Sequence, residues 1–120
     1  MSSDPTGEVI EAVEWDREFL RLQIDTVGGW FIEVENDFVV TDGKQAFDSR
    51  TEADQAVAAI QRYVSAKLEA FDFSESGSLR MSIGDVTLAV EPAYDFEAWH
   101  ATGPWPEKHM IICQPGGGIA

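Results

Sequence analysis

Apolar and polar residues alternate with a period of two through most of this 120-residue chain. Such alternation is typical of strands with one buried and one solvated face. Glycine, proline or Asx residues separate the alternating segments, and short turns between successive strands favour antiparallel pairing. Residues 8–15 fit either a strand or a short helix. The predicted strands cover residues 19–25, 30–35, 38–41, 79–83, 86–91, 96–101 and 109–114.

One segment breaks this period. Between residues 52 and 70 the apolar residues recur every three or four positions, which predicts one amphipathic helix about 28 Å long. Thr51 is the expected N-cap, with Asp54 three residues later in a weak form of the capping box. A long amphipathic helix needs a sheet against which to bury its apolar stripe. The sequence therefore predicts an α+β fold: a curved antiparallel sheet with one long amphipathic helix, at about 52–70, packed on one face.

The length and composition predict one domain over residues 8–120, preceded by a disordered tail at residues 1–7. Apolar residues make up 44% of the chain, and this content is typical of a globular domain rather than of an acidic disordered one. Cys113 is the single cysteine, so an internal disulfide is excluded. The start of the chain has no secretory apolar segment, and we expect a cytoplasmic location.

The chain is strongly acidic, with 22 Asp and Glu against 8 Lys and Arg and a net charge of -14. Phosphate backbones and anionic membranes are bound by Lys and Arg, so this balance opposes direct binding of either. Residues 1–60 hold 14 acids and 4 bases, whereas residues 61–120 hold 8 acids and 4 bases. Most of the negative charge therefore belongs to the first half, and a basic protein is the partner that it favours.

Catalytic and metal-binding patterns are sparse. His109 and Cys113 are four residues apart on a predicted strand, and this spacing places them about 13 Å from each other. The distance opposes both a zinc site and a thiol paired with a base. The apolar neighbours of Cys113 predict a buried, inert thiol. We expect no metal and no cofactor.

Glu33 and Glu35 share one face of a predicted strand about 7 Å apart. Such a pair is compatible with glycosidase chemistry or with a hard cation. The glycine and Asx pattern of a calcium loop is missing, which favours a solvated strand face that contacts a basic partner.

Trp30 and Trp99 lie on predicted strands and are expected in the core. Trp105 lies between two prolines and is the exposed candidate for an interface anchor. The glycines at 116–118 lack the following lysine and helix of a phosphate loop, so a flexible exit from the last strand is expected.

Residues 77–118 carry a set of motifs that resembles a family of small bacterial proteins of unknown function. The matching motifs are Phe96-Glu97-Ala98-Trp99 and Cys113-Gln114-Pro115-Gly116-Gly117. The predicted hairpin at residues 79–91 departs from the family pattern at its turn. The family has Asp followed by Gly, whereas this chain has Gly84-Asp85. The resemblance implies a compact, β-rich domain in which the matching residues are structural, and it carries no catalytic residue.

The chain also resembles immunity proteins, which protect bacteria from toxins, in its size, its acidity and its few catalytic residues. The leading hypothesis is a non-enzymatic protein that blocks a basic toxin domain. The alternatives are a nucleic-acid mimic, a small-ligand domain with Trp99 and Trp105 lining a pocket, and a hydrolase or transferase that uses His100 or His109 with Glu97. The residues proposed for the interface are Glu33, Glu35, Asp37, Asp42 and Trp105, with Glu11, Glu14 and Asp16 as second choice.

Overall fold

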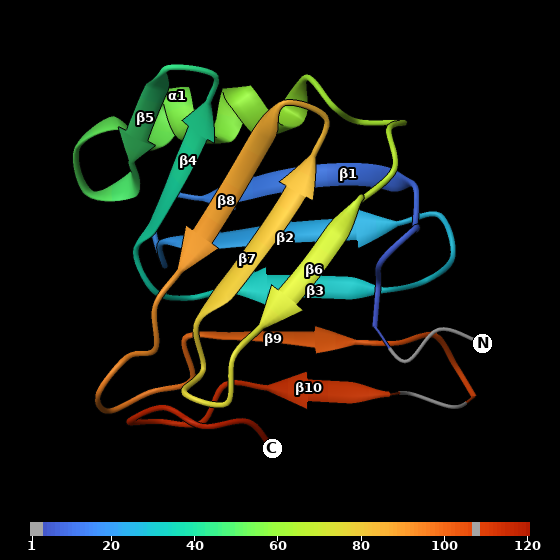
Figure 1. Ribbon diagram of the computed structural model, residues 1–120, viewed down its shortest axis with the longest axis vertical. Helices are drawn as coiled ribbons and strands as arrows, with labels where there is room; N and C mark the ends of the chain where they lie inside the picture. Colours follow the sequence, from blue (N-terminus) through green and yellow to red (C-terminus); the bar gives the residue numbers. More distant parts are fainter. Residues whose placement is uncertain (1–3, 107–108) are drawn as a thin grey trace.

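The computed structural model describes residues 4–106 and 109–120, so the predicted tail at 1–7 lies partly outside the described residues. In the described part of the chain, ten strands form two five-stranded antiparallel sheets, accompanied by one helix (Figure 1). The α+β class and the antiparallel pairing predicted from the sequence are confirmed.

The first sheet has the strand order β1-β2-β3-β9-β10. Its strands are β1 (Ile10–Asp16), β2 (Arg21–Thr26), β3 (Phe31–Val34), β9 (Trp99–Thr102) and β10 (Met110–Ile112). The second sheet has the order β5-β4-β8-β7-β6. Its strands are β5 (Gln45–Asp48), β4 (Phe38–Asp42), β8 (Val86–Val90), β7 (Leu79–Ile83) and β6 (Ala70–Phe73).

The two sheets stack, and their strands run in different directions in the view of Figure 1. The core lies between them because apolar side chains alternate with polar ones on most of the strands and are buried. In the first sheet Leu22, Ile24 and Ile32 are at most 1% exposed, and in the second sheet Val40 and Leu88 are at most 2% exposed. Trp30 and Trp99 belong to this core, as predicted.

The strands form two sheets where the sequence predicted one. Asx residues between the strands predicted at 30–35 and 38–41 are typical of a hairpin turn. The link at Asn36 and Asp37 instead carries the chain from β3 in one sheet to β4 in the other. The Asn36 side-chain amide donates to the carbonyl of Glu91, 2.9 Å away, and fixes this crossing. A link of this length fits both a hairpin and a change of sheet, and the distinction depends on pairing with strands far along the chain.

The helix is shorter than predicted. Helix α1 covers Ser49–Gln61, and its N-cap is Asp48 rather than Thr51. Leu68 and Phe71 continue the helical spacing of apolar residues, and both are buried. Leu68 reaches the core from extended chain, however, and Phe71 reaches it from β6. Backbone pairing explains the difference: the amide of Ser65 donates to the carbonyl of Ile10, and the amide of Leu68 donates to that of Glu8.

Two edge strands were missed by the sequence prediction. β5 precedes α1, and β6 begins at residue 70, where the predicted helix was expected to end, and continues beyond it. Both are four residues long, and neither has a clear alternation, since Phe73 on β6 is 40% exposed. Their positions depend on pairing with β4 and β7.

The residues of the family resemblance meet at one corner of the sandwich. The indole Nε1 of Trp99 donates to the carbonyl of Gly77 at 2.8 Å, and the amide of Cys113 donates to the carbonyl of Trp99. Gly77 has a φ of +102°, and a Cβ on it would lie 2.8 Å from the Sγ of Cys113. A Cβ on Gly117 would lie 2.6 Å from the carbonyl oxygen of Ser76. These residues are structural, as the resemblance implies.

The glycine-rich end is ordered by the same corner, so the flexible exit predicted for residues 116–118 is wrong. The amide of Gly116 donates to the carbonyl of Ala93, and the amide of Gly118 donates to that of Ser76. The chain then returns to the edge of β10, where the amide of Ala120 donates to the carbonyl of Ile112. This return covers part of an edge that would otherwise expose unpaired backbone groups.

We predict that Trp99→Phe destabilises the protein by about 2 kcal/mol, because it leaves a cavity and removes the donor to the buried Gly77 carbonyl. The change is measured as the free energy of unfolding in urea. Tyr94→Phe is the control, since Tyr94 is 92% exposed. Equal effects of the two substitutions would contradict the role assigned to this corner.

Candidate functional site

The outer face of the first sheet is the candidate site. The helix packs against β4, β5 and β1 and leaves the outward side chains of β2 and β3 uncovered. We call the outward side of β1, β2 and β3, extended by Glu35, the acidic face. Its side chains are Ala12, Glu14, Asp16, Arg21, Gln23, Asp25, Phe31, Glu33 and Glu35.

The structure brings together two residues from each choice of interface residues. Glu33 and Glu35 follow one another on the outward side of β3, and Glu14 and Asp16 do the same on β1. Asp25 on β2 completes the set of five carboxylates on this face. Sequence reasoning did not select Asp25, although its position in the alternation with Arg21 and Gln23 was the signal that could have found it.

The other predicted acids lie elsewhere. Asp37 is exposed in the link between the sheets, and Asp42 ends β4 in the second sheet, where Arg62 forms an ion pair with it. Glu11 lies at the irregular part of the β1–β2 pairing, between Ile10 and Ala12. The four acids of the first choice therefore do not form one patch.

Strand register places Glu33 in the middle of a row that crosses the whole sheet. Glu14 pairs with Gln23, Gln23 with Glu33, Glu33 with His100, and His100 with Ile112. Cross-strand neighbours of this kind are close enough for their side chains to interact. The row joins the acidic residues of β1–β3 to His100 on β9.

Glu33 is buried although its sheet face is uncovered. Its residue is 7% exposed, and the Gln23 Nε2 donates to its Oε2 at 2.9 Å. Glu35 lies two residues farther along the same side of the chain. The prediction of a solvated strand face is therefore wrong for Glu33, because neighbouring side chains on both flanking strands shield it.

The two carboxyl groups differ in proton affinity. Burial favours the neutral form of Glu33, but hydrogen bonds from Glu35 and Gln23 and the positive charges of His100 and Arg21 outweigh it and lower the pKa of Glu33. Burial raises the pKa of Glu35, and so do its hydrogen bond to Glu33 and the negative charge of that residue. The surroundings thus favour the ionised form of Glu33 and disfavour that of Glu35.

Some of the acids outside the acidic face form close ion pairs with an arginine. Close ion pairs join Arg17 to Asp54 and Arg50 to Asp48 at 2.9 and 2.8 Å. The Arg50 hydrogen bonds lower the pKa of Asp48 to about 2.

The acidic face has less compensation. Its five carboxylates share one arginine, Arg21, whose Nε lies 3.8 Å from Glu35 and whose guanidinium also covers the ring of Phe19. On the second sheet, by contrast, Asp72 on β6 pairs in register with Arg80 on the neighbouring strand β7. The five carboxylates and one arginine therefore leave the acidic face on β1–β3 strongly negative.

An apolar margin borders the acidic face on β9 and β10. We define it by Met110 and Ile112, with Phe31 at the boundary, where its ring lies 6.0 Å from that of His100. Met110 is 58% exposed. Trp105, in the loop between β9 and β10, is 78% exposed, so the predicted exposure of this side chain is confirmed.

The remaining candidates form no catalytic group in the described part of the chain. Cys113 is fully buried, and burial raises the pKa of its thiol, as expected for an inert cysteine. The described residues contain no cluster of three or more His, Cys, Asp or Glu that could hold a metal ion. In the same residues, no helix has the length and apolar character needed to cross a membrane.

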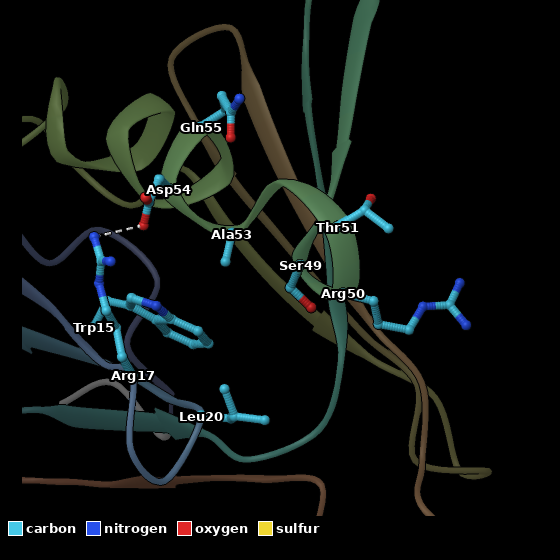
Figure 2. Close-up of a pocket in the computed structure, with 9 residues that line it drawn as sticks. All are labelled: Trp15, Arg17, Leu20, Ser49, Arg50, Thr51, Ala53, Asp54 and Gln55. Atoms are coloured by element: carbon cyan, nitrogen blue, oxygen red, sulfur yellow. Dashed lines mark ion pairs between the residues drawn. The ribbon is translucent and has the colours of Figure 1, made fainter.

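Figure 2 shows an open hollow between the β1–β2 hairpin and the start of α1. Trp15 and Leu20 come from the hairpin side, and the Arg17–Asp54 ion pair crosses its rim. Neither Trp99 nor Trp105 lines this hollow. The small-ligand alternative placed a pocket between those two residues, but Trp99 is fully buried between the sheets.

Comparison with known proteins gives one match. The model of a family described as a family of unknown function (DUF6188) matches residues 2–120. No curated protein and no solved structure matches the chain significantly.

We predict that Glu35→Gln stabilises the protein by about 0.5 kcal/mol at neutral pH, because it removes one of two adjacent like charges and places an amide donor near Glu33. The raised pKa of Glu35 means that the folded state binds the extra proton in a pH interval above the ordinary glutamate value. The stability of the native protein therefore falls relative to the variant as the pH rises through that interval. Urea unfolding at several pH values measures the difference, and a variant that is less stable than the native protein at neutral pH would contradict it.

Proposed function

Because the chain belongs to DUF6188, a family of unknown function, we propose its function from its own surface: it is a non-enzymatic binding protein whose acidic face contacts a basic protein. The observation that carries the proposal is the concentration of five carboxylates with a single, loosely held arginine on an uncovered sheet face. Such a surface attracts a positively charged partner from a distance and orients it before contact.

The apolar margin supports a protein as the partner. Interfaces combine polar contacts with a few large buried side chains, among which tryptophan is enriched. Met110 is mostly exposed at the margin of a face that has charge and little apolar surface of its own, and Trp105 is exposed in the loop between β9 and β10. A partner that covers both the acidic face and the margin gains steering from the first and buried apolar area from the second.

We infer further that the partner is a bacterial toxin domain with a basic active-site cleft and that the chain acts as its immunity protein. Enzymes that act on anionic substrates present clusters of Lys and Arg at their active sites. An acidic protein that covers such a cluster both blocks the substrate and associates rapidly.

The alternatives have less support in the geometry. A nucleic-acid mimic needs a regular double row of exposed acids, and the two rows on β1 and β3 include the buried Glu33. A small-ligand site built on Trp99 lacks access, because that side chain is enclosed in the core. For an enzyme, His100 pairs in register with Glu33 on β3 rather than with the expected Glu97, and Glu33 is only 7% exposed.

The proposal predicts that a protein encoded beside the gene for this chain is toxic when expressed alone and harmless when co-expressed with it. The purified pair should bind with an affinity that falls as salt is added, because exposed charges are screened. The triple substitution Glu14→Gln, Asp16→Asn and Asp25→Asn should weaken binding roughly tenfold or more, mostly through slower association. Surface plasmon resonance measures both rates.

The matched control is the triple substitution Asp72→Asn, Glu75→Gln and Glu91→Gln, which removes the same charge from exposed positions elsewhere. It should change association much less than the substitutions on the acidic face. If no neighbouring product is both toxic and bound, or if the two triple variants lose affinity equally, the proposed function is wrong.

A further inference from the structure

We propose that Phe19 and Leu20, at the tip of the β1–β2 hairpin, are the apolar anchor that inserts into the surface of the basic protein partner. The inference rests on the proposed function for the nature of that partner. The anchor itself is argued from side-chain exposure and backbone conformation, which do not involve the carboxylates of the acidic face.

The hairpin tip exposes two large apolar side chains in succession. Phe19 is 61% exposed and Leu20 is 59% exposed. Single exposed apolar residues are common on protein surfaces, whereas contiguous ones mark sites of interaction. The Oδ1 of Asp16 accepts hydrogen bonds from the amides of Glu18 and Phe19, so the turn is organised before any partner arrives.

The backbone at Leu20 is unfavourable for the residue that occupies it. Its φ is +54°, in the left-handed region that glycine and asparagine adopt most easily. Among the described residues, Ser65 is the one other non-glycine residue with a positive φ, and its amide pairs with the carbonyl of Ile10. Leu20 is mostly exposed, so burial of its side chain does not offset the strain. A strained position that keeps a large apolar side chain in solvent indicates that the side chain serves binding.

The tip lies between the acidic face and the hollow shown in Figure 2. Arg21, an outward residue of the acidic face, holds its guanidinium carbon 5.3 Å from the centre of the Phe19 ring. Leu20 lines the hollow together with Trp15 and the first turns of α1. A protein that covers the β1–β2 side of the acidic face therefore meets both apolar side chains.

Charge favours a basic protein over the other molecules that bind exposed apolar groups. Asp16, Arg17, Glu18 and Arg21 flank the tip, and polar residues around an apolar anchor are typical of a protein interface. A second copy of the chain would bring another net charge of -14 beside the acidic face. An anionic membrane is disfavoured by the same charge. A protein with an apolar pocket beside a positive surface fits both the tip and the acidic face.

The substitution Leu20→Asn tests the strain in the isolated chain. Asparagine adopts a positive φ more easily than leucine does, so the midpoint of urea unfolding should rise. Val27→Asn is the matched control, because Val27 is 65% exposed and does not have a positive φ. Its midpoint should not rise. A midpoint that falls or stays unchanged in Leu20→Asn would overturn the inference.

The partner encoded beside the gene tests the anchor. The double substitution Phe19→Ser and Leu20→Asn should weaken binding roughly tenfold or more, mostly through faster dissociation, because close apolar contacts hold the formed complex. The control is Val27→Asn with Tyr94→Ser, which also removes two exposed large side chains and should keep the native dissociation rate. Surface plasmon resonance separates this effect from the slower association expected of the triple variant on the acidic face.

The outcomes separate the anchor from the proposed function. If the triple variant on the acidic face loses affinity and the tip variant binds like the native chain, the anchor is wrong and the proposed function stands. If only the tip variant loses affinity, the anchor stands and the acidic face is not the contact. If no neighbouring product binds, both are wrong. Self-association of the native chain, or its binding to phosphatidylcholine vesicles, that disappears in the tip variant would assign the tip another occupant and overturn the inference.

Discussion

Most strands of this protein bury one side between the two sheets, and this constraint determines which side chains face solvent. The buried side includes Leu22, Ile24 and Ile32 in the first sheet, so Gln23, Asp25 and Glu33 must lie on the outer side. A shift of one residue in register would place these polar groups in the core. The acidic face is therefore fixed by the same packing that holds the sheets together.

The corner built around Trp99 and the acidic face lie on opposite sides of the first sheet. Trp99, Gly77 and Cys113 join the ends of strands from both sheets through close backbone contacts that only glycine allows. His100, the next residue after Trp99, points outward into the row that contains Glu33. The residues of the family resemblance thus support the scaffold, while the charge that carries the proposed function lies mostly on β1–β3.

Local patterns predicted much of the fold. The period of two gave the positions of most strands, and the turn at Gly84-Asp85 joins Ile83 to Val86 as expected for a hairpin, with Gly84 at a φ of +59°. The helix was predicted too long because Leu68 is buried by extended chain that keeps helical spacing by coincidence. The change of sheet at Asn36 and the burial of Glu33 depend on residues distant in sequence, and no local pattern encodes them.

The central claim is that negative charge is concentrated on the outer side of β1–β3. Paramagnetic relaxation of amide protons by a cationic and an anionic nitroxide co-solute measures the electrostatic potential near each residue of the isolated chain. The account predicts the most negative potential beside Glu14, Asp25 and Glu35 and a weaker one over β6–β8 and α1. A potential spread evenly over the surface, or strongest beside α1, would contradict it.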